Sequence, residues 1–295
     1  SENEKTVPNS ILINTNLIIE GMQFLESIEN LTNSNLLSDR KLGNQGGPLK
    51  GISTRQIFDG SRLYKKNVSS VVFLVNMMED RIIGCGSILS KEGQILTNWH
   101  VVNGSEKMLV WFYDKNITLS TNLKENCTIA EVIAIDKKRD LALLKLIKSK
   151  KDILPMDLGN EFKISIAQDV FAIGHPKKSL WSFSYGAISQ IHKKYEWNSE
   201  KGVKHIADLI LSQTPTNPGN SGGPLFNDKG NLIGINTTKV KGYEGLNFAI
   251  NISEVKSFYK DALQGRYKHE FSSIINKEEK YSKLFDVDNN GITDR

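Results

Sequence analysis

The middle of the chain alternates short apolar runs with turn-forming residues. VVFLV, AEVIAI and DLILSQ are such runs, and Gly, Asn and Asp separate them from their neighbours. Short runs of this kind, bounded by turn residues, are typical of β-strands. The segment after a turn at Lys91–Gly93 is a further example, with a strand predicted at Gln94–Thr97. The pattern predicts a mostly β core, and no apolar run approaches the length of a membrane-spanning helix.

Apolar residues at helical spacing occur on the N-terminal side of this core. Within residues 1–66, the stripe in Asn16–Leu31 predicts one helix. A second helix is predicted at Ser53–Lys66, with a Ser-Thr pair as its N-terminal cap. A polar linker with several glycines, Asn33–Gly51, separates the two. These helices either pack on the β core or bind a partner, and packing is the simpler interpretation.

Residues 253–295 form a second extension. They predict a helix at about Ser253–Leu263, a break at Gln264–Gly265 and a charged helical stretch at Phe271–Phe285.

The last residues, DVDNNGITDR, match the first half of a calcium-binding loop. The oxygen ligands would be Asp286, Asp288 and Asn290. The position of the bidentate glutamate that completes such a loop is missing. A polar tail or a weak calcium site is therefore expected here, and a tight metal site is not.

Composition limits the classes of function. With 295 residues and 39% hydrophobic side chains, the chain can hold two small β-barrels with extensions. The net charge of +5 is mild and spread along the chain. The basic patches His192–Lys194 and Lys148–Lys151 are expected to be solvated loops, so no nucleic-acid partner is predicted. Cys85 and Cys127 are the two cysteines of the sequence, too few for a disulfide framework.

The segment NPGNSGGPL, Asn217–Leu225, places Ser221 in a glycine-rich turn. Glycines leave room for a tight turn and for the close approach of a substrate carbonyl. Such a turn can direct the amides of Gly219 and Ser221 at one point, as an oxyanion hole requires. Taken alone, the same letters also fit a purely structural turn.

A serine needs a histidine to take its proton and a carboxylate to orient that histidine. His100 follows the predicted strand Gln94–Thr97, where a short helical turn could present it to a cleft. Asp140 precedes the apolar strand Leu141–Leu146, which would carry a carboxylate inward. Asp136, four residues earlier, is the alternative and is expected to be a solvated turn residue.

The order His100, Asp140, Ser221 and the letters around each resemble the HtrA/Deg branch of the chymotrypsin-superfamily serine proteases. The motifs that carry the resemblance are ILTNWHVV, RDLALLKL, DVFAIGHP, YGAISQI, NPGNSGGPLFNDKGNLIGINT and GLNFAINISEV. They occur in the family's order between about Val68 and Val255. The resemblance implies two antiparallel six-stranded β-barrels of chymotrypsin type at about 67–150 and 160–252, within a protease domain at 67–252.

The same resemblance implies a serine endopeptidase that cleaves protein or peptide substrates without a metal or organic cofactor. Ser221 would be the nucleophile, His100 the general base and Asp140 its orienting group, with Gly219 and Ser221 forming the oxyanion hole. The alternative is a catalytically silent protease fold that only captures peptides.

Four residues are expected to contact substrate, namely Thr216, Ile235, Asn236 and Thr237. The backbone of Ile235–Thr237 would pair with the substrate as an added strand. The primary pocket has no acidic residue at its base, and Asn236 stands where glutamyl endopeptidases have a histidine. A small uncharged side chain is therefore expected before the scissile bond. If Thr216 points away, the pocket would be an ordinary aliphatic one.

Further expectations come from the family. Its N-terminal segments often support trimers, so the resemblance implies a homo-oligomer through residues 1–66 as the alternative to packing on the β core. Residues 253–295 are too few for a PDZ domain of ordinary size, so none is expected in this chain. The resemblance also suggests an extracytoplasmic compartment, periplasmic or secreted, or an organelle.

Overall fold

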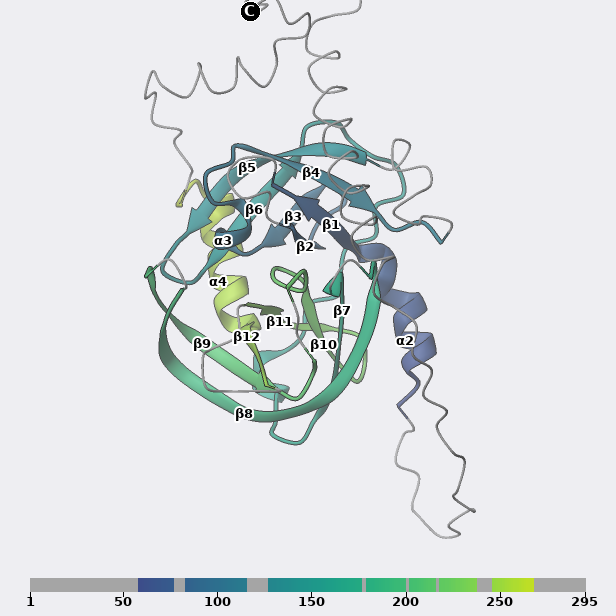
Figure 1. Ribbon diagram of the computed structural model, residues 1–295, viewed down its shortest axis with the longest axis vertical. Coiled ribbons are helices and arrows are strands. Elements are labelled where there is room, and N and C mark those ends of the chain that lie inside the picture. The colour runs from purple at the N-terminus through teal and green to yellow at the C-terminus, as the bar shows by residue number, and fades with distance from the viewer. Residues whose placement is uncertain are drawn as a thin grey trace, which may run out of the picture.

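Two closed antiparallel β-barrels of six strands each form the structure (Figure 1), as the sequence predicted. They are seen in a computed structural model that describes residues 58–76, 83–115, 127–176, 179–199, 202–215, 218–237 and 246–267.

The first barrel is built from the N-terminal half of the core. Its strands are β1 (Val71–Val75), β2 (Ile83–Ile88), β3 (Gln94–Thr97), β4 (Lys107–Phe112), β5 (Cys127–Asp136) and β6 (Leu141–Leu146). They close in the order β1-β2-β3-β6-β5-β4. The boundaries of β3 and β6 are those predicted from the sequence.

Strand β1 shows why these strands are continuously apolar. Val72 and Leu74 belong to one core cluster, whereas Val71, Phe73 and Val75 belong to another that includes side chains of the second barrel. Alternate side chains of a strand point to opposite faces, so both faces of β1 are buried. An apolar run without alternation is the pattern that such a strand requires.

The second barrel follows the same plan. Its strands are β7 (Asp169–Gly174), β8 (Ser182–Asn198), β9 (Lys204–Ser212), β10 (Pro224–Asn227), β11 (Leu232–Asn236) and β12 (Asn247–Asn251). They close in the order β10-β11-β12-β9-β8-β7. The prediction of a solvated loop at His192–Lys194 was wrong, because these residues lie within β8 at a register shift against β9. Such a bulge lets a strand continue through a stretch that lacks strand-like alternation.

The barrels share a core of large side chains. Phe73 and Trp111 of the first barrel and Phe171, Phe226 and Phe248 of the second belong to one buried cluster. Burying a ring of this size stabilises the fold by roughly 2 kcal/mol. The shared cluster therefore fixes how the two barrels sit against each other, and with them the residues at their junction.

Helix α2 (Gly60–Asn67) precedes η1 (Val68–Ser70) and enters the first barrel. The predicted start at Ser53 was wrong, because the helix begins at Gly60 and Asp59 is its cap, accepting from the Arg62 amide at 3.0 Å. A side-chain carboxylate satisfies an amide that the first turn leaves unpaired. The predicted helix at Asn16–Leu31 lies outside the described residues.

Helix α4 (Ile252–Leu263) follows β12, close to the predicted helix. It lies across the side of both barrels (Figure 1) and buries Val255 and Phe258. The break after it falls at Gln264, as predicted. The predicted stretch at Phe271–Phe285 lies outside the described residues, as do the three calcium candidates.

Two short helices complete the described elements, α3 (Trp99–Val102) and η2 (Glu161–Lys163). Cys85 and Cys127 are both free thiols, and burial raises the pKa of each well above its ordinary value. In the part of the chain that the structure describes, no helix has the length and apolar character needed to cross a membrane.

Candidate active site

The carboxylate of Asp140 is buried where the two barrels meet. Asp140 ends the β5–β6 turn with a φ of 57°, a left-handed conformation that Asp tolerates better than most residues. Its backbone oxygen accepts from the Trp99 amide at 3.2 Å and from Asn98 Nδ2 at 3.0 Å. These bonds tie the turn to the segment that begins α3.

His100 lies in the single turn of α3, as predicted, and contacts Asp140 twice. Its backbone amide donates to Asp140 Oδ1 at 3.0 Å, and its Nδ1 lies 2.8 Å from Asp140 Oδ2. The carboxylate therefore fixes both the backbone and the ring of His100. With Nδ1 protonated toward Asp140, Nε2 is left as the basic nitrogen of the neutral imidazole.

Thr237 supplies a third bond to this carboxylate from the second barrel. Its hydroxyl donates to Asp140 Oδ2 at 2.7 Å, just beyond the end of β11. From the sequence, Thr237 was predicted to contact substrate, and its bond to the Asp140 carboxylate was not predicted. The contact joins residues 97 positions apart, so no local sequence signal could have shown it.

The turn that carries Ser221 is hydrogen-bonded to both barrels. The backbone oxygen of Ser221 accepts from the Cys85 amide of β2 at 2.8 Å, and the Gly222 amide donates to Asn236 O of β11 at 2.9 Å. A Cβ placed on Gly84 would lie 2.5 Å from Val101 Cγ1 and 3.3 Å from Ser221 O. Ser221 is thus beside the helix turn that carries His100.

Two glycines of this turn are required by its geometry. Gly219 has a φ of 105°, and a Cβ there would lie 2.1 Å from His175 O. Gly222 has a φ of 83°, and a Cβ there would lie 2.1 Å from Thr97 Oγ1. At both positions the positive φ and the lack of space for a Cβ exclude a side chain, which explains why glycine is needed there. Within the described residues, neither the Gly219 amide nor the Ser221 amide donates to a protein acceptor.

His175 packs against the same turn and was missed by the sequence reasoning. Its amide donates to Gly219 O at 3.3 Å. Its ring is fully buried, with Nδ1 accepting from the Trp181 amide at 3.0 Å and Nε2 lying 3.3 Å from Val72 O. These partners require the neutral tautomer with the proton on Nε2. Burial lowers the pKa of His175 to about 3.

The predicted substrate strand needs correction. Ile235 lies opposite Pro224 of β10 and Ile250 of β12, so it is paired on both sides. The Asn236 amide donates to Gly223 O at 2.8 Å, and its carbonyl accepts from Gly222. The prediction that these two residues pair with substrate was therefore wrong, because their backbone groups close the barrel. Thr216 lies outside the described residues.

Asp136 was also predicted wrongly as a solvated turn residue. Its side chain is 5% exposed, and its Oδ2 lies 2.7 Å from Arg139 Nε. A carboxylate buried this deeply requires a partner, and the guanidinium three residues later supplies it. No group of three or more His, Cys, Asp or Glu side chains suited to a metal ion occurs among the described residues.

Comparison with known proteins agrees with this fold. Protease Do-like 1, chloroplastic, of Arabidopsis thaliana is 32% identical over 188 residues, which cover 60% of this chain and 40% of that protein. A probable periplasmic serine endoprotease, DegP-like, of Halomonas elongata is 39% identical over 178 residues, covering 59% of this chain and 34% of that protein. The chain thus spans less than half the length of these curated relatives.

A solved structure of the HtrA-type protease AlgW with a tripeptide superposes with a TM-score of 0.60 at 26% identity, covering 75% of this chain and 71% of that one. Residues 84–235, about half of the chain, match the trypsin-like peptidase domain. The chain therefore belongs to the trypsin-like peptidase family and, within it, to the HtrA/Deg type.

The burial of neutral His175 predicts a pH-dependent stability. Its folded pKa of about 3 lies below the ordinary value of 6.5, so the unfolded chain takes up the proton first as pH falls. The stability that the neutral, buried His175 ring contributes is fully present above about pH 6.5 and is lost progressively as the pH falls toward about 3. Between pH 7 and pH 5, this one group should cost about 2 kcal/mol of unfolding free energy.

Urea unfolding followed by tryptophan fluorescence at pH 7 and pH 5 measures this loss. In His175→Asn, the difference between the two pH values should be smaller by about 2 kcal/mol than in the wild type. Equal differences in the two proteins would contradict the buried, neutral state of His175.

Proposed function

We propose that this protein is a serine endopeptidase that uses Ser221, His100 and Asp140. The observation that carries the proposal is the buried carboxylate of Asp140, which holds the amide and ring of His100 while the Ser221 turn is bonded to the adjacent strand β2. The family supports hydrolysis of peptide bonds, and this site supplies the groups that such a reaction needs.

The reaction begins when His100 Nε2 takes the hydroxyl proton of Ser221 as its oxygen attacks the peptide carbonyl. The resulting imidazolium is stabilised by Asp140, which remains ionised. His100 then gives the proton to the leaving amine, and an acyl group stays on Ser221. A water molecule, deprotonated by His100, releases the acid product and restores the site.

The negative charge on the carbonyl oxygen would be bound by the amides of Gly219 and Ser221. Both amides are without a protein acceptor within the described residues, so a ligand oxygen would not have to displace one. Oxyanion donors of this kind contribute about 10²- to 10³-fold in rate. Contact with His175 holds the turn in the positive-φ conformation that glycine at position 219 allows.

The alternative, a silent fold that captures peptides, is less well supported. A fold that only captures peptides does not need a buried carboxylate that orients a histidine ring. Leaving Asp140 charged and buried costs several kcal/mol of desolvation, which the bonds from His100 and Thr237 offset. That cost is understandable in a site that must orient a histidine.

The assignment predicts the effect of removing the nucleophile. Ser221→Ala should lower the rate of casein degradation by roughly 10⁴-fold or more while the circular dichroism spectrum stays unchanged. Ser149→Ala, which alters an exposed serine after β6, is the matched control and should keep full activity. Casein degradation by purified Ser221→Ala at the wild-type rate would rule out the assignment.

Substrate choice is proposed from the neutral groups around β11 and β12. Asn236 Nδ2 donates to Pro224 O at 3.0 Å, and its Oδ1 accepts from Asn247 Nδ2 at 2.7 Å. The Ser212 and Thr214 hydroxyls form a second buried pair at 2.5 Å. These polar groups carry no charge, so a charged substrate side chain placed against them would lose its hydration without gaining a counter-ion.

Cleavage should therefore follow small uncharged residues such as Val, Ala or Thr. Mass spectrometry of the fragments from a digested unfolded protein measures this preference directly. Fragments that end mainly in Lys, Arg, Asp or Glu would show the proposed pocket to be wrong.

We further assign the protease domain to residues 67–252, with extensions at 1–66 and 253–295. Protein or peptide substrates follow from the proposed reaction. A homotrimer through residues 1–66 and an extracytoplasmic or organellar compartment remain proposals that rest on the family alone.

A further inference from the structure

The turn that presents Asp140 has one backbone hydrogen bond across it and a bond from the Arg139 amide to the Asp136 side chain, at Oδ1, of 3.1 Å. It connects β5 to β6, and Asp140 at its end has the left-handed φ of 57°. The bond that closes the turn, from the Asp140 amide to Lys137 O, is long at 3.4 Å. Sparsely populated backbone conformations persist only where the surrounding structure holds them. The position of Asp140 therefore depends both on its own bonds to the Asn98–His100 segment and to Thr237 and on what contacts the other side of the turn.

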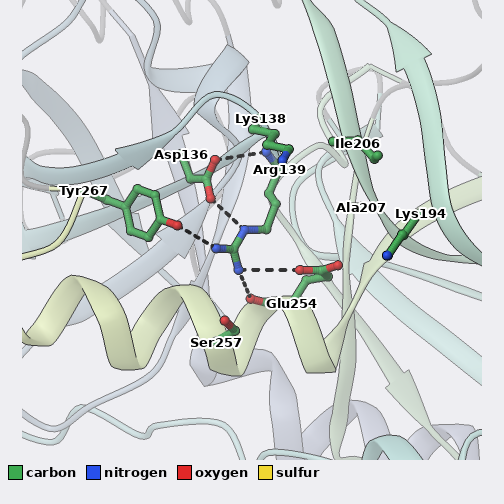
Figure 2. Close-up of a pocket in the computed structure, with 9 residues that line it drawn as sticks. All are labelled: Asp136, Lys138, Arg139, Lys194, Ile206, Ala207, Glu254, Ser257 and Tyr267. Atoms are coloured by element: carbon green, nitrogen blue, oxygen red, sulfur yellow. Dashed lines mark hydrogen bonds and ion pairs between the residues drawn. The ribbon is translucent and has the colours of Figure 1, made fainter.

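Arg139, the neighbour of Asp140, makes several of those contacts (Figure 2). From β9, the Ile206 amide also donates to Lys138 O at 2.7 Å, and His205 Nδ1 lies 2.6 Å from Lys137 O. Arg139 Nε donates to Asp136 Oδ2 at 2.7 Å, closing the turn from within. One terminal nitrogen donates to the backbone oxygen of Glu254 at 3.3 Å and lies 3.5 Å from its carboxylate. The other donates to the Tyr267 hydroxyl at 2.9 Å. The planar guanidinium thus links the turn to α4 and to the segment after it.

The partners of Arg139 are themselves anchored. The second carboxylate oxygen of Glu254 accepts from the Asp208 amide of β9 at 3.1 Å. The backbone oxygen of Tyr267 accepts from the Ile135 amide of β5 at 3.0 Å. Helix α4 is held by buried Val255 and Phe258. Arg139 is therefore attached to rigid parts of both barrels.

A pocket of about 560 Å³ opens beside this cluster, as Figure 2 shows. Its lining includes Lys138, Lys194 and Ser257 besides Arg139 and its partners. Because water can enter such a pocket, Asp136 can be hydrated when Arg139 is replaced. A variant at this position is thus expected to fold, unlike one that leaves a carboxylate unpaired in a closed core.

We infer that Arg139 is a positioning residue, through which α4 and Tyr267 hold the β5–β6 turn so that Asp140 meets His100. The inference rests on the proposed function, because it concerns the proposed catalytic pair. Arg139 does not reach the reacting atoms. It acts on the reaction through the peptide bond that joins it to Asp140. The packing of α4 is thereby coupled to the position of Asp140 relative to His100.

The test compares Arg139→Gln with Arg266→Gln, the same substitution at an exposed arginine next to Tyr267. In the full chain, Arg139→Gln should lower kcat for a labelled casein by about 10- to 100-fold, because small displacements of catalytic groups are costly. KM should change by less than about threefold, because the residue does not contact substrate. Arg266→Gln should match the wild type in both constants.

A second readout does not depend on activity. The Nδ1 proton of His100, bonded to Asp140, should give a low-field proton resonance that is lost in Asp140→Asn. In Arg139→Gln this resonance should shift or broaden, whereas Arg266→Gln should leave it unchanged. Tyr267→Phe removes one partner of Arg139 and should give a smaller change in the same direction.

The two proposals can fail separately. If the wild type degrades no casein, the proposed function fails, and the resonance still decides the role of Arg139. An unchanged resonance together with wild-type kcat in folded Arg139→Gln would overturn the inference. Should Arg139→Gln fail to fold, Tyr267→Phe decides it by the same two measurements, and wild-type behaviour of that variant would overturn the inference.

Discussion

The arrangement of this protein depends on one buried charge. The Asp140 carboxylate accepts two bonds from His100 of the first barrel and one from Thr237 beside β11 of the second. An ionised carboxylate can stay buried only when donors replace the water it loses. Neither barrel supplies all of those donors alone, so the charge is tolerated only when both barrels are docked. The same bonds that make burial tolerable also orient His100.

The serine turn shows the same dependence on the junction between the barrels. Ser221 is bonded through its backbone to β2, and Gly222 to β11. Gly219 has no room for a side chain because His175 lies against it, and the His175 ring reaches the backbone of β1 at Val72. The nucleophile and its base are thus positioned by contacts that cross from one barrel to the other. The large aromatic cluster shared by the barrels gives this junction its stability.

Much of this could be predicted from the sequence, because the relevant signals are local. The letters around His100, Asp140 and Ser221 are short motifs, and strands such as β3 and β6 are apolar runs with clear ends. The short helical turn at His100 was likewise predictable from its place after a strand. Glycine was expected near Ser221 because tight turns need it, although the contact with His175 was not.

Most of what could not be predicted depends on contacts between distant residues. Thr237 was predicted to contact substrate, and the bond from its hydroxyl to Asp140 was not predicted. Asp136 was expected in solvent, yet Arg139 and Glu254, 115 residues further along the chain from Arg139, bury it in an ion-pair cluster. The start of α2 was misplaced because two possible caps occur close together, and the structure uses Asp59. For Thr237 and Asp136 the deciding contacts include partners distant in the sequence, which periodicity and propensity do not show, whereas the cap of α2 is local.

The central claim is that the Asp140–His100 pair activates Ser221 as a nucleophile. Reaction with a fluorophosphonate probe, followed by peptide mass spectrometry, measures that reactivity at the residue itself. The account predicts one covalent adduct on Ser221 in the native protein, and none after heat denaturation or in His100→Ala. An unmodified Ser221 in the folded wild type, or an adduct formed equally well in His100→Ala, would contradict it.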